Sequence, residues 1–167
     1  GNLVHFSSSF TLTAANADEW NYVKPGTEGL VAMALINELG HAEDIDPTGL
    51  LADYASEVIA EDIGVDSETI TRIAHELELS HHPLALGGGQ AAAHTNGLSN
   101  LKAILSINNV LNNVGQKGGV ILNPDSPLPG VIAPRPGDSF SDFHRMVEEM
   151  NNGSVQVPVS YTHLTLP

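Results

Sequence analysis

The chain has 167 residues and a formal charge of −14, from 20 acidic and 6 basic side chains, and it contains no cysteine. This is the length of one domain, and an apolar content of 41% is enough for a hydrophobic core. The negative charge argues against nucleic acid and anionic membrane surfaces as direct partners. Without cysteine there are no disulfides or thiolate metal ligands, and no apolar run is long enough for direct membrane insertion.

The N-terminal region predicts two short strands. Residues 3–6 form an apolar run typical of a buried strand, and Ser7, Ser8 and Ser9 form the loop at its carboxyl end. A second short strand is expected around Asp18, in the sequence Ala-Asp-Glu-Trp. Trp20 in this sequence is expected to anchor the core.

A turn of unusual composition follows, Lys24-Pro25-Gly26-Thr27-Glu28. Pro25 fixes φ, Gly26 lets the backbone approach a ligand closely, and Thr27 can cap a helix that begins at Glu28. Because the positive end of that helix would point at the turn, the pattern suits a phosphate bound by backbone N–H groups. A helix start with nothing bound is the alternative interpretation of the same pattern.

The next part of the chain predicts three helices. Apolar residues three and four apart indicate a helix over 28–39, another that passes through residues 50–59 and ends near Gly64, and a third capped by Asp66 or Ser67.

Twelve of the 20 acids lie in residues 38–78, where Arg72 is the one base. Such a block is typical of solvated helix faces. A phosphate site is therefore expected at the turns instead of on this acidic region.

Residues 83–86 predict a further strand, closed by three glycines, and residues 97–111 a further helix. The helix is expected to pack on the sheet through a stripe of residues three and four apart: Leu98, Leu101, Ile104, Leu105, Asn108 and Leu111. His94 is expected to face a pocket from the intervening loop, and Asn96 to cap the helix.

Strand, helices, strand and helix in this order predict an α/β fold, with a parallel sheet and Rossmann-like three-layer packing. Ligands bind such sheets beyond the carboxyl ends of the strands.

The C-terminal part of the chain, from residue 121, divides into three segments of different composition. Residues 121–138 are dense in Pro and Gly and predict an irregular excursion or a linker. Residues 139–158 predict a helix and the start of a strand, the beginning of a further α/β unit. Residues 159–167 look like the translation of a sequencing adapter and are left out of the fold prediction. The chain as a whole is interpreted as an incomplete domain, an internal piece of a larger protein.

Two blocks of the sequence resemble one family. The first comprises Thr11, Thr13, Ala14, Ala17, Asp18, Trp20 and the Pro-Gly-Thr-Glu turn. The second is Asn113-Val114-Gly115-Gln116-Lys117-Gly118-Gly119, similar to a Gly-Asn-x-Gly-x-x-Gly-Gly loop. In order and spacing they resemble the molybdopterin oxidoreductases related to dimethyl sulfoxide reductase and formate dehydrogenase, over residues 3–120.

The resemblance implies a set of cofactor contacts. In this family a Pro-Gly-Thr-Asp turn contacts the nucleotide end of molybdopterin guanine dinucleotide, which implies that residues 24–28 hold phosphate or guanine. Asn113 and Gly115 would lie near the pterin, and Asp18 and His94 complete the expected contacts. The Asp-Pro-Arg sequence that commonly ends the family's first strand falls on the serines at 7–9, so its acid and its base are both replaced.

The resemblance also implies a function for the parent protein, while the fragment alone is not expected to be catalytic. The parent would be an oxidoreductase subunit that passes electrons between a substrate at molybdenum and iron–sulfur clusters outside this segment. Its partners would be iron–sulfur and membrane-anchor subunits, in a periplasmic or membrane-associated complex.

Two alternatives stay open. The three serines permit a cofactor-less scaffold subunit of a membrane quinone oxidoreductase complex, as in the large subunit of alternative complex III. A small module that binds NAD or ATP is the other, although the chain lacks the Gly-x-Gly-x-x-Gly and P-loop patterns.

Overall fold

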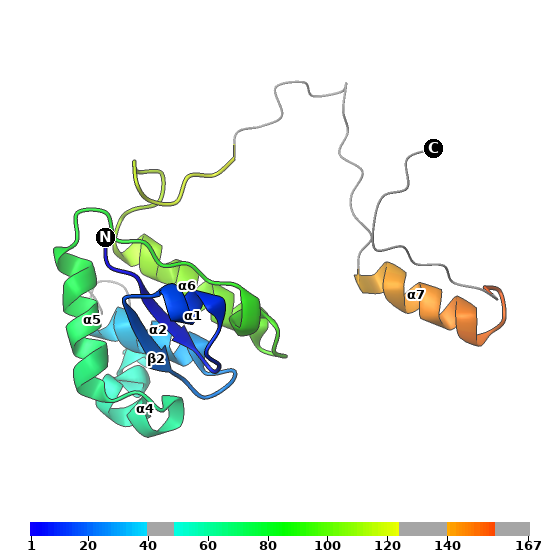
Figure 1. The fold of residues 1–167 in the computed structure, drawn as a ribbon, viewed down its shortest axis with the longest axis horizontal. Helices are drawn as coiled ribbons and strands as arrows, with labels where there is room; N and C mark the ends of the chain where they lie inside the picture. The colour runs from blue at the N-terminus through cyan, green and yellow to red at the C-terminus, as the bar shows by residue number, and fades with distance from the viewer. Residues whose placement is uncertain (40–48, 124–139, 156–167) are drawn as a thin grey trace. The chain divides into compact units, whose positions relative to one another are not determined.

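The computed structural model describes residues 1–39, 49–123 and 140–155. The elements in chain order are β1 (Val4–Ser7), α1 (Leu12–Asn16), β2 (Glu19–Tyr22), α2 (Glu28–Glu38), the 3₁₀ helix η1 (Leu50–Tyr54), α4 (Ser56–Ile63), α5 (Ser67–Leu79), the 3₁₀ helix η2 (Gly89–Ala92), α6 (Gly97–Val110) and α7 (Phe140–Asn151). They belong to two compact units, residues 1–123 and 124–167, of which the second contains α7 (Figure 1).

The sheet of the first unit consists of β1 and β2 in its described part. The two strands pair in parallel, with Val4 opposite Glu19 and Ser7 opposite Tyr22. The connection between them contains α1, whose first turn is capped by the hydroxyl of Thr11. The predicted α/β class is confirmed as a mixed α/β fold with parallel strands, but a full Rossmann-like three-layer packing is not shown.

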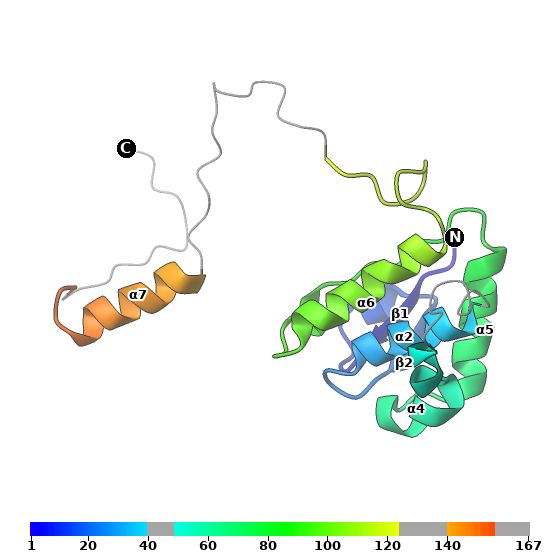
Figure 2. The same ribbon diagram turned by 180° about the vertical axis from the view of Figure 1, so that it is seen from behind.

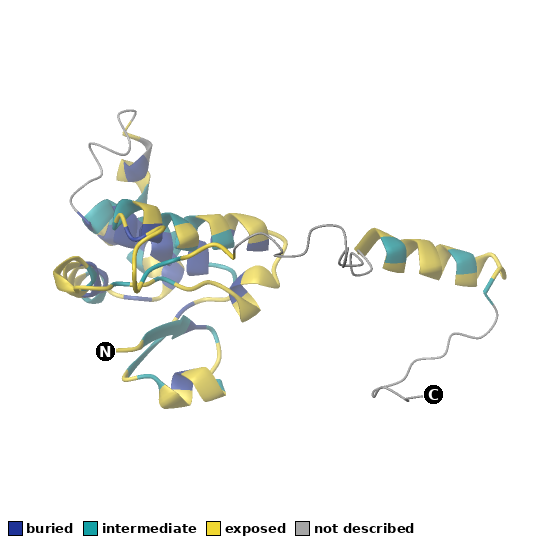
Figure 3. Ribbon diagram, turned by 90° about the horizontal axis from the view of Figure 1, so that it is seen from above, coloured by how far each residue is buried: buried dark blue, intermediate teal, exposed yellow. Residues whose placement is uncertain are grey.

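Helix α2 lies at the centre of the first unit, between α5 and α6 (Figures 1 and 2). Its sequence is apolar on nearly every side, which is the pattern of a buried helix. Val31, Ala34 and Leu35 are at most 5% exposed, and they pack with buried residues of α4 and α5 such as Ile63 and Ile70. Figure 3 shows these buried positions concentrated in the packed helices, whereas α1 is mostly exposed.

The three helices predicted after the turn are present in the described residues, with one interruption. The second predicted helix is divided into η1 and α4 at Ala55, and it ends at Gly64, which adopts the left-handed conformation with φ +84°. Asp66 caps α5, because its Oδ1 accepts a 2.8 Å hydrogen bond from the Thr69 amide.

Residues 83–86 do not form the predicted strand. In place of a neighbouring strand, the side chain of Asn108 on α6 binds this segment: the Ala85 amide donates to Asn108 Oδ1 at 3.0 Å, and Asn108 Nδ2 donates to the Ala85 carbonyl at 2.8 Å. The amide therefore supplies the pair of hydrogen bonds that a strand would otherwise supply.

The buried face of α6 agrees with the predicted stripe in part. Leu98 and Leu105 are 68% and 49% exposed, whereas Ile104, Asn108 and Leu111 of the stripe pack inward. Asn100 and Ile107, which lie outside the predicted stripe, are buried as well, and α6 packs chiefly on α2 and not on a sheet.

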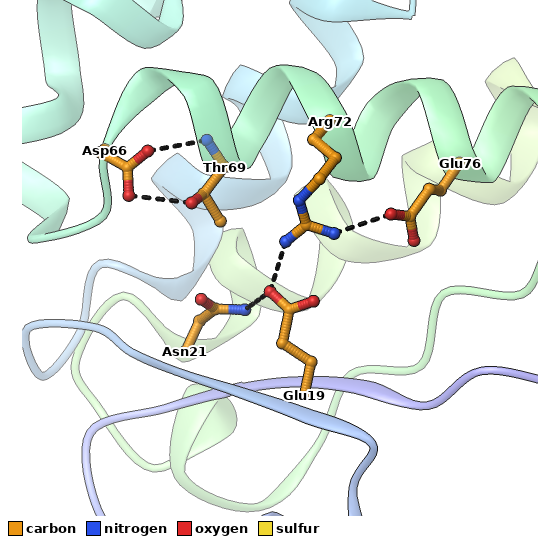
Figure 4. A network of polar contacts seen from close by, with 6 residues as sticks. All are labelled: Glu19, Asn21, Asp66, Thr69, Arg72 and Glu76. Carbon is orange, nitrogen blue, oxygen red and sulfur yellow. Dashed lines mark hydrogen bonds and ion pairs between the residues drawn. The ribbon is translucent and has the colours of Figure 1, made fainter.

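Strand β2 and helix α5 are joined by a polar network centred on Arg72 (Figure 4). Arg72 Nη2 lies 2.6 Å from Glu19 Oε1, and its Nη1 lies 2.7 Å from Glu76 Oε1. Hydrogen bonds from Asn21 and Arg72 hold the pKa of Glu19 below its usual value. The hydrogen bonds that Arg72 donates to Glu19 and Glu76 raise the pKa of Arg72. The one base among twelve acids thus joins a helix to the sheet.

Replacing Glu19 with glutamine is expected to reduce the dependence of the free energy of unfolding on pH in the acidic range. Because the pKa of Glu19 is lower in the folded chain than in the unfolded chain, its contribution is present above the unfolded value and disappears as the pH falls through the folded value. The expected loss at neutral pH is about 0.5 kcal/mol, since the pair is solvent-screened. Urea unfolding at neutral and acidic pH measures it. Glu61→Gln, on an exposed part of α4, is the control, and equal pH profiles for the two variants would contradict the prediction.

The second unit contains the predicted C-terminal helix as α7, residues 140–151. Its apolar residues follow a helical spacing, yet none is buried, and Phe140 is 87% exposed. The predicted strand from residue 155 and the segments 124–138 and 159–167 lie wholly or almost wholly outside the described residues. Across the described ranges, no helix combines the length and apolar character needed to cross a membrane.

Candidate functional site

Three chain segments meet at the carboxyl edge of the sheet. They are the serines that follow β1, the turn between β2 and α2, and the loop that precedes α6 (Figures 1 and 2). Helices α2 and α6 begin side by side there, since Asn96 Nδ2 donates a 2.9 Å hydrogen bond to the Gly26 carbonyl. This is the edge at which parallel sheets bind ligands.

The turn at residues 24–28 is built as predicted, with two differences. Gly26 has φ +83°, a conformation that glycine adopts without strain. Thr27 does not cap α2: its hydroxyl donates to the Lys24 carbonyl at 2.7 Å. The Lys24 ammonium points to α4, where it donates to the Glu61 carbonyl at 2.6 Å. The one basic side chain of the turn is therefore occupied by the protein itself.

Glu28, the first residue of α2, is buried and unpartnered. It is 6% exposed, and among the described residues neither of its carboxylate oxygens has a hydrogen-bond donor. The positive end of the helix favours a negative charge at this position, but a buried carboxylate without hydrogen bonds is costly. Such a group requires a donor, and a ligand can provide one.

His94, which was expected to face a pocket, lies against the turn. A Cβ added to Gly26 would lie 3.6 Å from Cγ of the His94 ring, so a side chain at residue 26 would touch the imidazole. Asn96 precedes α6 but makes no capping bond, because its amide reaches the Gly26 carbonyl instead.

The serines after β1 are satisfied within the chain. Ser7 accepts a 2.9 Å bond from Trp20 Nε1 and donates to the Ser9 carbonyl at 2.8 Å. Gln90 joins the other two, because Ser8 Oγ donates to its Oε1 at 3.2 Å and its Nε2 donates to Ser9 Oγ at 2.9 Å. The sequence analysis did not identify Gln90 as a site residue, since its partners are about 80 residues away in the chain.

Asp18 lies at the opposite edge of the sheet. It precedes β2, and its Oδ2 accepts a 2.8 Å bond from the amide of Leu3, just before β1. Since the strands run in parallel from this edge toward Ser7 and Tyr22, the length of both strands separates Asp18 from the turn. The structure does not bring Asp18 together with the other predicted contacts.

Asn113 and Gly115 are also separated from the turn. They follow the C-terminal end of α6, a helix of 14 residues that spans about 21 Å. Asn113 is buried, and its Nδ2 donates to the Pro83 carbonyl and to Asn108 Oδ1. Gly115 has φ +79° and donates its amide to the Val120 carbonyl at 2.8 Å, which closes the loop on itself. These contacts stabilise the fold.

A metal site is not evident in the structure. His81 and His82 are exposed, and no group of three or more metal-ligating side chains occurs within residues 1–39, 49–123 and 140–155. An open surface depression lined by Glu38, Glu68 and Arg72, among others, lies on α5. Its acidic lining does not suit a nucleotide phosphate.

Comparison with known proteins gives one informative similarity. No protein-family model matches the chain. Over 115 residues, 65% of its length, the chain is 31% identical to the menaquinone reductase, molybdopterin-binding-like subunit of Nitratidesulfovibrio vulgaris. The aligned region spans 16% of that protein. The similarity supports a molybdopterin-related family loosely, in agreement with the resemblance noted in the sequence.

Proposed function

We propose that the chain is a fragment of a molybdopterin-oxidoreductase-type subunit, and that its carboxyl-edge turn receives the guanine end of molybdopterin guanine dinucleotide. The observation that carries the proposal is the unpartnered, buried carboxylate of Glu28, in the turn that resembles the family's nucleotide contact. The similarity to a molybdopterin-binding-like subunit supports it independently.

The chemistry of the turn favours guanine over phosphate. A carboxylate repels a phosphate, and the Lys24 ammonium that could attract one is bound to Glu61. The Watson–Crick edge of guanine presents two donors, N1–H and the 2-amino group, that match the two oxygens of one carboxylate. Of the two roles predicted for residues 24–28, we therefore retain the contact with the base.

The residues that would hold this end of the cofactor are few. Glu28 would accept hydrogen bonds from the base, and because its carboxylate oxygens are closed to solvent in the free chain, the turn would have to open for the base to reach them. Gly26 would permit the close approach of the base, and His94 would flank it. The serines at 7–9 have hydroxyls but no charge. For Ser8 and Ser9 to bind a ribose or phosphate, their hydrogen bonds to Gln90 would have to be exchanged for bonds to the ligand. When bound, the cofactor supplies the redox chemistry, and this segment orients it.

We propose that the parent assembles with iron–sulfur and membrane-anchor subunits in a periplasmic or membrane-associated complex, with its clusters outside this segment. The matched relative is named as a subunit of a menaquinone reductase, which supports an assembly with partner subunits.

A cofactor-less scaffold is the second candidate, and two observations favour it. Gln90 occupies the hydroxyls of Ser8 and Ser9, and by resemblance Ser7 and Ser9 stand where the family commonly has its acid and its base. In addition, Leu86, Leu98 and Leu105 expose apolar surface on and beside α6, which would suit contacts with other parts of an assembly.

Metal and pterin analysis of the full-length parent separates the two candidates. After expression with the cofactor supplied, the proposed function predicts stoichiometric molybdenum or tungsten and one or more pterin nucleotides per chain. Guanine released by acid hydrolysis would identify the dinucleotide form. A correctly folded parent without metal and pterin would establish the scaffold instead.

A further inference from the structure

Asn100 is a buried polar residue in the first turn of α6 that no sequence motif identified. It is 4% exposed, and its side chain contacts three neighbours. Its Nδ2 donates to the Ala91 carbonyl at 3.1 Å and to the Gly26 carbonyl at 3.5 Å, and its Oδ1 accepts from Asn96 Nδ2 at 3.3 Å. One amide thus connects the loop before α6 with the turn before α2.

The backbone of α2 also rests directly on Asn100. Gly29 follows Glu28, and a Cβ at residue 29 would lie 2.9 Å from Cα of Asn100 and closer still to its side-chain oxygen. Real Cβ atoms do not approach that closely, so glycine is needed for this contact. Asn100 therefore fixes the chain on both sides of Glu28, at Gly26 through a hydrogen bond and at Gly29 through packing.

We infer that Asn100 is a positioning residue that sets the place of the Glu28 carboxylate for recognition of a base with two adjacent donors. The inference rests on the proposed function. Two parallel hydrogen bonds to one carboxylate require close alignment of both partners. If the start of α2 shifts against α6, the two bonds cannot both keep good geometry, and one of them is lost first.

A pair of nucleotides measures this alignment. Guanosine diphosphate offers N1–H and the 2-amino group, whereas inosine diphosphate lacks the 2-amino group and is otherwise the same. Their affinity ratio therefore reports the second hydrogen bond alone. For the wild-type chain, one charge-assisted hydrogen bond predicts a ratio of about tenfold in favour of guanosine diphosphate.

The experiment is calorimetric titration of the whole 167-residue chain with both nucleotides. Asn100→Asp keeps the size of the side chain but removes the donor to Ala91 and Gly26, and it is expected to reduce the ratio to about threefold or less. Asn109→Asp is the matched control, because it adds the same charge to an exposed position of the same helix. The control is expected to keep the wild-type ratio.

A second variant provides the test if the Asn100→Asp chain does not fold. Asn96 is exposed, so Asn96→Ala should fold, and loss of its bond to Gly26 is expected to lower the ratio part of the way. An unchanged ratio in the folded variants, including an equal loss of affinity for both nucleotides, would overturn the positioning role while the proposed function stands. A wild-type chain that binds neither nucleotide would overturn the proposed function itself, and the inference with it.

Discussion

Replacing Glu28 with glutamine is expected to weaken the binding of guanosine diphosphate by about 10- to 100-fold, the equivalent of one or two charge-assisted hydrogen bonds. A glutamine side chain presents one acceptor and one donor, so its NH₂ group would face a donor of guanine. The same amide matches the donor and acceptor of adenine. We therefore expect the preference for guanosine diphosphate over adenosine diphosphate to fall sharply or to reverse.

The same substitution is expected to stabilise the free chain by about 1 kcal/mol, because it removes a buried charge that has no hydrogen-bond donor. Affinity and stability would then change in opposite directions, as is typical of a residue retained for binding. Glu28→Asp is the control, since it keeps the charge and matches the family's Pro-Gly-Thr-Asp turn. Titration calorimetry and thermal unfolding give the two quantities. A Glu28→Gln chain with unchanged nucleotide preference would remove the proposed role of Glu28.

Asn108→Asp is expected to lower the free energy of unfolding by about 3 kcal/mol or more. Asn108 is fully buried, and its side chain binds both the amide and the carbonyl of Ala85. Aspartate would lose the donor to the Ala85 carbonyl and would bury a carboxylate beside that oxygen. The next residue on α6, Asn109, is also an asparagine, so the same substitution there provides a close control.

Asn109→Asp introduces the same charge at the adjacent, exposed position, and it is expected to cost about 0.5 kcal/mol, mainly through the unfavourable charge near the C-terminal end of α6. Urea unfolding of both variants gives the comparison. If the two variants were equally stable, the Asn108 side chain would not be what holds residues 83–86 on α6.

Local signals predicted most of the longer helices of this chain. Asp66 caps α5, Gly64 ends α4, and the spacing of apolar residues identified α2 within one residue of its observed end, whereas the short helix α1 was not predicted. These signals act between residues a few positions apart, and such short-range effects are encoded directly in the sequence.

The strand predicted at residues 83–86 failed for a tertiary reason. A short apolar run before glycines is compatible with a strand, but its hydrogen bonds go to the Asn108 side chain, 23 residues further along the chain. The predicted stripe of α6 is correct only in part for a similar reason: Ile104, Asn108 and Leu111 pack inward, but Leu98 and Leu105 are exposed because α6 packs chiefly on α2. Partner identity at such a distance is not visible in the spacing of apolar residues.

The candidate site was predicted in part. The turn at residues 24–28 and the loop that carries His94 meet at the carboxyl edge of the parallel strands, where such loops converge. Asp18 and Asn113 were grouped with them on the strength of the resemblance, and the register of β1 and β2 and the length of α6 separate them. The burial of Glu28 and the contacts of Asn100 depend on how α2 packs against α6, which no motif records.

The most direct test of the guanine contact is a titration of the isotopically labelled wild-type chain with guanosine diphosphate, in which NMR measures the chemical shifts of the backbone amides. We expect saturable shifts at Gly26, Glu28 and His94. The amides of Asp18, at the opposite edge of the sheet, and of Gly115, beyond the C-terminal end of α6, are expected to stay unchanged. Shifts confined to the loop after α6, or none that saturate, would contradict a nucleotide site at the start of α2.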